Sequence, residues 1–314
     1  MHILVVNDDG PPSRRYAPYL RPFVDALQEA GHRVSVAVPA TSRSWIGKAH
    51  LIGAVLKASY VPPDDFREDG SWETVVNPDA PTHVTAEPNE DEKPGRQEGE
   101  TDWVVVHDGT PASCTQLGLF DLFPNRGPID LVVSGPNHGP NTSTIYNLSS
   151  GTVGGALEAV TCGKRGIALS FGSKEEQAQA VVCAASRLAV RVIEHLCQNW
   201  DLGVELYNVN VPMRSDVERR SVHYAQALPN VWTKGSLYAE RPTVDPGEGA
   251  PAKGFGLLPS WIWYGSTTEE PRRAPSRERY FQWSTELSDI KKSLDSSEDG
   301  TDARILRDGY TRFG

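Results

Sequence analysis

The stretch that decides the fold is MHILVVNDDG, residues 1–10, an apolar run that stops abruptly at two carboxylates and a glycine. The apolar part predicts a buried β-strand that begins at the first residue. In an open parallel sheet, ligands bind at the carboxyl ends of the strands. Adjacent carboxylates at such an end suit a hard cation such as Mg²⁺. A turn built from Asx residues and Gly10 is the alternative interpretation of the same residues.

The segments that follow continue an α/β pattern. Apolar residues at helical spacing over 14–30 predict a helix that ends at Gly31, with Pro18 and Pro22 early in it or at a kink. Residues 34–38 predict a second strand, and this strand–helix–strand order favours a parallel sheet. Further strands are predicted at 103–106, 129–135, 167–170 and 206–211, and helices near Ala112, after Ser150 and over 174–197. The chain is therefore expected to be an α/β protein with a mostly parallel sheet flanked by helices.

Composition divides the chain into a core and an extension. Residues 1–212 carry the α/β pattern, interrupted at about 60–101 by a segment rich in Pro, Asp and Glu, of which 86–101 is expected to be solvated and mobile. After Pro212, Trp residues stand among Pro and Gly with no long helical pattern. Residues 213–314 are therefore expected to form a β-rich extension, with a loop at 288–300.

Charge and cysteine content limit the function classes. The 314 residues carry a formal net charge of −10, which argues against a stable nucleic-acid partner. A small anionic substrate stays possible, because one metal ion reverses the local sign of charge. The 4 Cys show no CxxC pair, and no apolar run has the length of a membrane span or a signal peptide. These features predict a cytoplasmic protein without membrane partners.

Polar residues gather at the predicted strand ends. Residues 7–10, 41–44 and 134–137 each follow or end a strand, and parallel strands place these ends on one edge of the sheet. Their carboxylate, hydroxyl and amide oxygens suit Mg²⁺, Mn²⁺ or Ca²⁺. Residues 150–152, Ser-Gly-Thr, open a helix whose N–H groups favour phosphate. A metal beside an anion pocket predicts metal-assisted phosphoryl transfer.

Six segments in this order, MHILVVNDDG, VAVPATSRS, DGTPASCTQLGL, IDLVVSGPNHGPN, SSGTVGGALEA and YNVNVP, resemble the SurE (survival protein E) phosphatases and 5′/3′-nucleotidases. The resemblance, to a eukaryotic, fungal-like member, covers about residues 1–212 and returns at Thr301-Asp302 and 308–310. It implies a Rossmann-like core, a divalent metal and a phosphomonoesterase that acts on nucleoside monophosphates and other phosphate monoesters. It also implies a homodimer or homotetramer assembled through exchanged C-terminal segments.

The resemblance assigns roles by position. It places the metal ligands at Asp8, Asp9, Ser44 and Asn137, and the phosphate-binding groups at Asn141, Ser150, Gly151 and Thr152. Asp8 or Asp9 would orient or deprotonate the attacking water. The sequence departs from the family after Gly10, where Pro11-Pro12-Ser13 stands, and at Trp45, which makes the loop beside the metal bulkier.

Other interpretations remain at this stage. An Asp nucleophile would give an aspartyl-phosphate route. The opening strand, helix and strand also fit a sugar-nucleotide glycosyltransferase, and a phosphatase scaffold can serve as a non-catalytic nucleotide-binding protein. His138 could protonate the leaving group or be a solvent-exposed loop residue.

Overall fold

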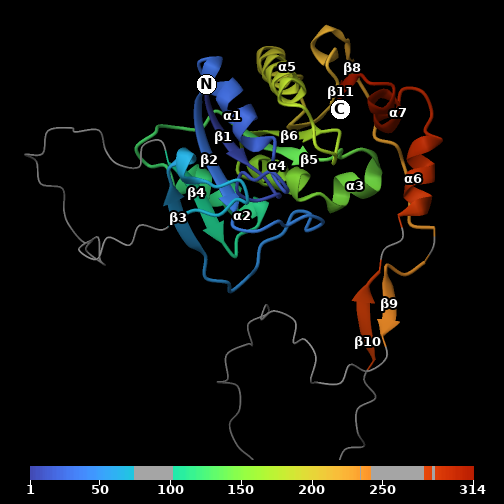
Figure 1. Cartoon of the computed structure of the whole chain (residues 1–314), viewed down its shortest axis with the longest axis horizontal. Coiled ribbons are helices and arrows are strands. Elements are labelled where there is room, and N and C mark those ends of the chain that lie inside the picture. The colour runs from blue at the N-terminus through green and yellow to red at the C-terminus, as the bar shows by residue number, and fades with distance from the viewer. Residues whose placement is uncertain (74–101, 234, 242–278, 285–286) are drawn as a thin grey trace, which may run out of the picture. The chain divides into compact units, whose positions relative to one another are not determined.

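The computed structural model describes residues 1–73, 102–233, 235–241, 279–284 and 287–314 (Figure 1). The chain forms two compact units, one made of Met1–Asn230 with Ser297–Gly314 and the other of Val231–Ser296. The first unit extends past residue 212 and takes in the last residues of the chain. The expected mobile segment at 86–101 lies outside the described residues.

The first unit is built on a nine-stranded sheet with the order β3-β4-β2-β1-β5-β6-β7-β11-β8. In this sheet order, the six strands from β4 across to β7 run parallel to one another. Strand β3 is antiparallel to β4, and strand β11 is antiparallel to β7. The bounds are β1 His2–Val6, β2 Arg33–Pro39, β3 Lys57–Val61, β4 Trp103–His107, β5 Leu131–His138, β6 Arg165–Phe171, β7 Leu206–Val211, β8 Val222–Tyr224 and β11 Thr311–Phe313.

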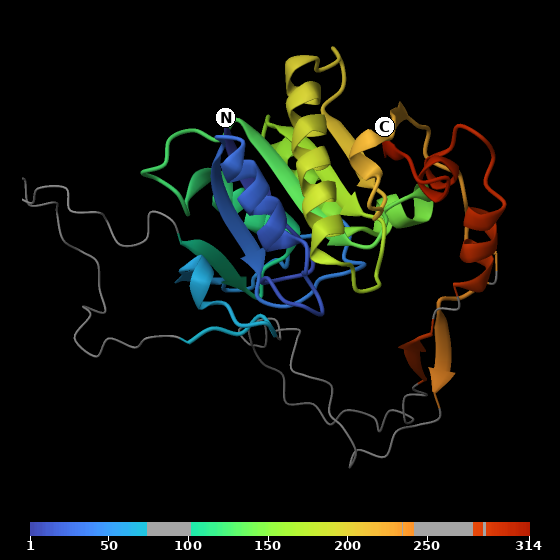
Figure 2. The same ribbon diagram turned by 45° about the horizontal axis from the view of Figure 1, so that its top comes forward.

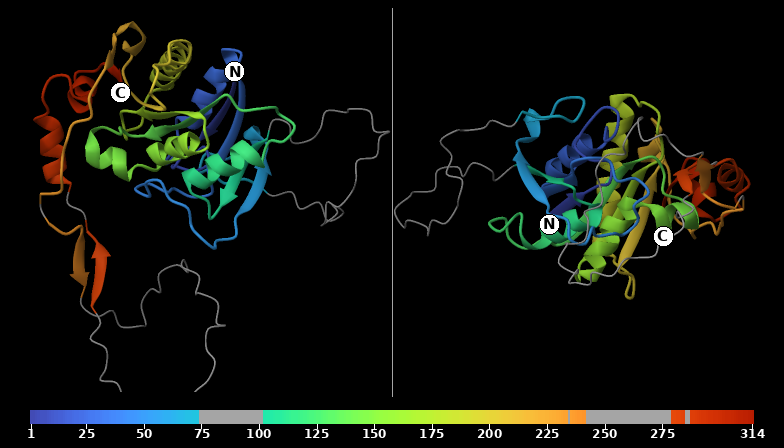
Figure 3. Two further views of the ribbon diagram at one scale, coloured as in Figure 1. Left: turned by 180° about the vertical axis from the view of Figure 1, so that it is seen from behind. Right: turned by 90° about the horizontal axis from the view of Figure 1, so that it is seen from below.

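Helices cover both faces of this sheet. Helices α1 (Leu20–Glu29) and α5 (Gln179–Gln198) lie on one face, in front of the sheet in Figure 2. Helices α2 (Pro111–Phe120) and α4 (Gly151–Thr161) cover the other, seen from behind in Figure 3. The short helices are α3 (Ser143–Ser149), α7 (Asp302–Arg307), η1 (Pro63–Asp65) and η2 (Val217–Arg219). None of the helices in the described part of the chain has the length and hydropathy needed to cross a bilayer.

Strand β1 is apolar throughout because both of its faces are buried. Ile3 and Val5 pack in the core under α1 and α5, while Leu4 and Val6 pack in the core under α2. Alternation along a strand sends successive side chains to opposite faces, so only a continuous apolar run can fill both cores. The polar residues begin at Asn7, directly where the chain leaves the sheet.

The strand order creates a switch point beside β1. The chain lays β2 and β4 on one side of β1, and then β5, β6 and β7 on the other. Connections on the two sides diverge at such a point and leave a crevice at the carboxyl ends of the strands. The strand order puts this switch point between β1 and β5, so the ends of these two strands are where a ligand is expected. The predicted α/β, Rossmann-like, mostly parallel fold is confirmed.

Several element boundaries differ from expectation. Helix α1 begins at Leu20 and not near residue 14, because Pro18 precedes it and Pro22 fits only its first turn. The expected loop at 288–300 is wrong over its first part, since Ser288–Asp295 forms helix α6 in the second unit. Leu287, Ile290 and Leu294 recur at helical spacing there. The second unit also holds an antiparallel ribbon of β9 (Tyr238–Arg241) and β10 (Tyr280–Trp283).

Candidate active site

The turn after β1 is closed by Asn7 and Gly10. The Asn7 side-chain amide nitrogen donates to the Gly10 carbonyl at 2.8 Å, and its Oδ1 accepts from the Gly10 N–H at 3.1 Å. Gly10 has a φ of +99°, which favours glycine. The turn therefore uses the Asn7 side chain and leaves the carboxylates of Asp8 and Asp9 for other roles. Both are buried, at 3% and 8% exposure.

Asp8 lies against the first turn of α4. The Thr152 hydroxyl donates to Asp8 Oδ1 at 2.5 Å, and the Ser150 hydroxyl caps the helix by accepting from the Val153 N–H at 3.2 Å. A Cβ atom on Gly151 would stand 2.7 Å from the Asp8 Cβ, so only glycine allows this approach. The first strand and the start of α4 are thus packed together at the predicted anion site.

Asp9 joins the end of β1 to the end of β5. Its Oδ2 accepts from the His138 backbone N–H at 2.8 Å. The neighbouring Asn137 donates from its amide nitrogen to the Gly139 carbonyl at 2.6 Å. No residue in the described ranges donates a hydrogen bond to the Asn137 Oδ1, which leaves that oxygen available as a ligand.

Ser44 stands at the edge of this cluster. The Arg43 N–H donates to the Asp8 carbonyl at 2.7 Å, which ties the loop after β2 to the turn after β1. Ser44 itself is exposed, and its hydroxyl lies 3.2 Å from that of Ser42. The structure therefore connects the predicted ligands through chain neighbours: Asp9 accepts a hydrogen bond from His138, next to Asn137, and Asp8 accepts one from Arg43, next to Ser44.

Asn141 is buried, as Ser150 and Thr152 are, and residues of β6 and β7 hold it in place. Its backbone N–H donates to the Asn210 Oδ1 at 2.9 Å, and its side-chain nitrogen donates to the Ser170 hydroxyl at 3.0 Å. An asparagine amide has two N–H hydrogens, so one remains for another acceptor. The sequence points to Asn141 but not to the β6 and β7 residues that hold it.

The two carboxylates have no basic partner within ion-pair distance in the described chain. Burial raises the pKa of Asp8 in spite of the Thr152 hydrogen bond. Burial and the Asp8 charge raise the pKa of Asp9 well above its usual value. Lys174 opposes both shifts from a distance. Buried carboxylates are costly unless a cation compensates them, so these atoms fit a divalent ion.

The available donors are all oxygens. Two carboxylates, the Asn137 Oδ1 and a serine hydroxyl form the kind of set that Mg²⁺ or Mn²⁺ takes. The described residues contain no group of three or more His, Cys, Asp or Glu side chains that could hold a metal. An ion at this site would therefore complete its coordination with amide, hydroxyl or water oxygens.

A groove of about 820 Å³ opens beside His138. Its lining includes Tyr19, whose ring meets the His138 ring edge-on at 5.3 Å, and Lys174. Burial and the charge of Lys174 lower the pKa of His138, and burial raises the pKa of Tyr19 to about 12. Sequence patterns did not single out Tyr19 or Lys174, because the folded chain alone brings them to this groove.

Known proteins share this chain's sequence and fold. A family model described as survival protein SurE matches residues 3–234. The 5′-nucleotidase SurE of Archaeoglobus fulgidus is 29% identical, with 99% of this chain and 88% of that protein aligned. The 5′-nucleotidase SurE of Synechococcus sp. is 33% identical, with 68% of this chain and 64% of that protein aligned.

Two further matches extend this result. A Saccharomyces cerevisiae protein named probable tubulin–tyrosine ligase PBY1 is 37% identical over 74% of this chain, and the chain spans only 31% of its length. The crystal structure of the SurE protein from Aquifex aeolicus superposes with a TM-score of 0.57 at 22% identity, covering 100% of this chain and 92% of that one. The resemblance seen in the sequence is confirmed, and the chain belongs to the SurE family.

Proposed function

We propose that this protein is a divalent-metal-dependent phosphomonoesterase that hydrolyses nucleoside monophosphates and related phosphate monoesters. The observation that carries this proposal is the buried Asp8–Asp9 pair, which lies at the switch point of the sheet and has no basic partner among the described residues. The first turn of α4 lies directly against it. The name 5′-nucleotidase, which several relatives carry, supports the same reaction class.

The metal would be held by Asp8, Asp9, the Asn137 Oδ1 and the Ser44 hydroxyl. When bound, Mg²⁺ or Mn²⁺ supplies positive charge to the phosphoryl oxygens and lowers the pKa of a coordinated water. Asp8 or Asp9 would orient the attacking water and accept its proton. Thr152 holds the Asp8 carboxylate through its hydroxyl, so we assign it a positioning role as well as a place in the phosphate loop.

The phosphate would lie at the start of α4. The Ser150 hydroxyl, the Gly151 N–H and the remaining N–H of the Asn141 amide would donate to its oxygens. A helix N-terminus favours an anion, and fixed donors stabilise the charge that develops on the equatorial oxygens. The groove beside His138 would receive the leaving group. Burial and the Lys174 charge lower the pKa of His138, which favours its neutral form and a binding role over proton donation.

Phosphate release in the presence and absence of chelator tests this proposal. We expect purified protein to hydrolyse nucleoside monophosphates and an aryl phosphate with Mg²⁺ or Mn²⁺, and to lose this activity in EDTA. Restored metal should restore the rate, and Asp8→Asn should not respond to it. Full turnover in EDTA would exclude the metal mechanism. Metal-stabilised protein that binds a nucleotide but releases no phosphate would be a binding protein instead.

We also propose that residues 213–314 supply oligomerisation arms and that the protein works as a homodimer or homotetramer. Support comes from the β9–β10 ribbon, whose Tyr238, Tyr280, Phe281 and Trp283 are all exposed within their unit. Isolated two-stranded ribbons are marginally stable, and exposed aromatic clusters are typical of interaction surfaces.

We further propose a cytoplasmic location. The four cysteines are unpaired, which is typical of proteins in a reducing compartment.

A further inference from the structure

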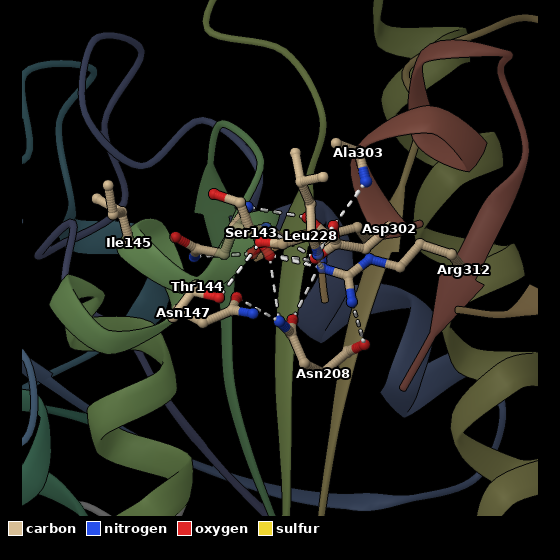
Figure 4. A network of polar contacts seen from close by, with 12 residues as sticks. Ser143, Thr144, Ile145, Asn147, Asn208, Leu228, Asp302, Ala303 and Arg312 are labelled. Atoms are coloured by element: carbon tan, nitrogen blue, oxygen red, sulfur yellow. Dashed lines mark hydrogen bonds and ion pairs between the residues drawn. The ribbon is translucent and has the colours of Figure 1, made fainter. Parts of the chain in front are cut away.

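A buried carboxylate near the C-terminus fastens three segments of the chain. Asp302, which is fully buried, accepts hydrogen bonds from the backbone N–H groups of Ser143 at 2.7 Å, Leu228 at 2.9 Å and Ala303 at 2.7 Å (Figure 4). Ser143 lies 159 residues away in sequence. The carboxylate therefore ties the loop after β5 to the start of α7.

Arg312 reaches the same loop from strand β11. Its guanidinium is buried, with 2% exposure, and Nη2 donates to the Asn141 carbonyl at 2.6 Å. The same nitrogen lies 3.5 Å from the Asp302 Oδ2, and Nη1 donates to the Asn208 carbonyl at 3.4 Å. One side chain thus connects β11, β7 and the Asn141 loop.

The loop that these residues hold is strained and fixed from several sides. Ser143 has a φ of +74°, a conformation that costs a non-glycine residue energy and persists only when its surroundings impose it. The side-chain amides of Asn208 and Asn210 also donate to the Asn141 carbonyl, at 3.1 and 3.2 Å. The loop leads through α3 to Ser150, the N-cap of α4.

Stability alone does not explain a buried ion pair. Desolvation of Arg312 and Asp302 offsets much of their attraction, and an apolar pair of similar volume is often as stabilising. What the pair adds is geometry, because a planar guanidinium and a carboxylate fix the directions of the groups that they bind. Those groups are the Asn141 carbonyl and the Ser143 N–H, on either side of the loop that leads to the phosphate site.

We propose that Arg312 and Asp302 are positioning residues that hold the Asn141–Ser143 loop, and through it the donors of Asn141 and Ser150, in place for the substrate phosphate. This inference rests on the proposed function. Neither residue touches the Asp8–Asp9 pair, so the metal site should not depend on them. The last residues of the chain are therefore part of the phosphate-binding machinery although they lie far from it in sequence.

Steady-state kinetics and hydrogen exchange on the full chain test this proposal. For Arg312→Gln we expect KM for an aryl phosphate to rise at least about tenfold, with a smaller loss in kcat. Arg312→Lys keeps the positive charge but loses the planar guanidinium with its two Nη donors. Its KM should lie between those of Arg312→Gln and the wild type. Mn²⁺ affinity should stay unchanged in both. Amide exchange over residues 141–149 should quicken, while exchange in β1 stays as in the wild type.

A matched variant distinguishes a specific effect on the Asn141–Ser143 loop from a general loss of stability. Leu306→Ala removes packing from α7 without altering either charged group, and should lower the melting temperature without changing KM. Guanidinium ion added to Arg312→Ala should restore part of the lost affinity. A wild-type KM with wild-type exchange in Arg312→Gln would overturn the proposal, as would equal effects of Leu306→Ala. Wild-type protein without phosphatase activity would contradict the proposed function instead, and the exchange data would still decide whether the pair holds the loop.

Discussion

Asp8 and Asp9 are adjacent in sequence, but their carboxylates differ in hydrogen-bond partners and in pKa. Asp8 accepts a short hydrogen bond from Thr152, which partly compensates its burial. Asp9 accepts from one backbone N–H and lies beside the charge of Asp8, so its pKa is raised well above the usual range. Without a cation, Asp9 is therefore the more destabilising of the two when ionised.

Asp9→Asn should separate stability from activity. Asparagine keeps an oxygen for the His138 N–H and removes a buried charge. In EDTA at neutral pH we expect its melting temperature to exceed that of the wild type, by about 2–4 °C for each kcal/mol gained. Phosphate release with Mg²⁺ should fall on the order of 10²-fold or more, because a metal ligand is lost. Thermal unfolding and a phosphate assay measure the two effects.

The control is the pH dependence of the difference in melting temperature between Asp9→Asn and the wild type. A carboxyl whose folded pKa is raised stabilises the fold below its unfolded pKa, and that contribution is lost as pH rises through the folded value. The ordinary Asp value is 3.8. The melting temperatures in EDTA should therefore converge near that pH and separate as pH increases. A difference that stays constant with pH would show that the Asp9 charge is already compensated.

At the scale of elements, helices α4 and α2 on one face of the sheet both begin with a hydroxyl N-cap, but their N-termini have different surroundings. Ser150 caps α4 beside Asp8. Thr110 caps α2, where its hydroxyl accepts from the Ser113 N–H at 3.1 Å. Both caps satisfy a helix N-terminus, but only the first has a carboxylate and a predicted phosphate next to it.

Ser150→Ala and Thr110→Ala form a matched pair. Each removes an N-cap hydroxyl and should cost about 1 kcal/mol of stability. Only Ser150→Ala should raise KM for phosphomonoesters, by about tenfold, because only its hydroxyl would contact the substrate. Chemical denaturation and steady-state kinetics on both variants check this. An equal change in KM for the two variants would show that Ser150 acts as a helix cap alone.

Local sequence patterns predict the elements that form because of their own residues. They miss the elements and contacts that depend on partners distant in sequence. The run at residues 3–6 predicts β1 because both of its faces are buried. The same reasoning predicts the candidate site at the end of β1, since parallel strands align their carboxyl ends. Strand β3 was not predicted, because only its pairing with β4 makes residues 57–61 a strand. Arg312 was missed for the same reason: it meets Asn141 across 171 residues of sequence.

At the scale of the whole molecule, the C-terminal segment completes the sheet of the first unit. Strand β11 lies antiparallel to β7 and parallel to β8, so the last residues join the sheet that carries the site. The intervening unit of Val231–Ser296 presents a two-stranded ribbon. Under the two proposals made above, the end of the extension would support the phosphate loop and its middle would mediate assembly.

Phe281→Asp should reveal whether the ribbon assembles copies of the chain. Phe281 is 54% exposed in its unit, and its neighbour Gln282 is exposed on the opposite face of β10. We expect wild-type protein to elute as a dimer or tetramer in light-scattering chromatography, and Phe281→Asp to shift toward monomer. Gln282→Asp, with the same added charge, should leave the assembly intact. Because the proposed site lies entirely in the first unit, phosphate release should stay within a few-fold in both. A monomeric wild type, or equal dissociation by both variants, would show that the Phe281 face does not hold the copies together.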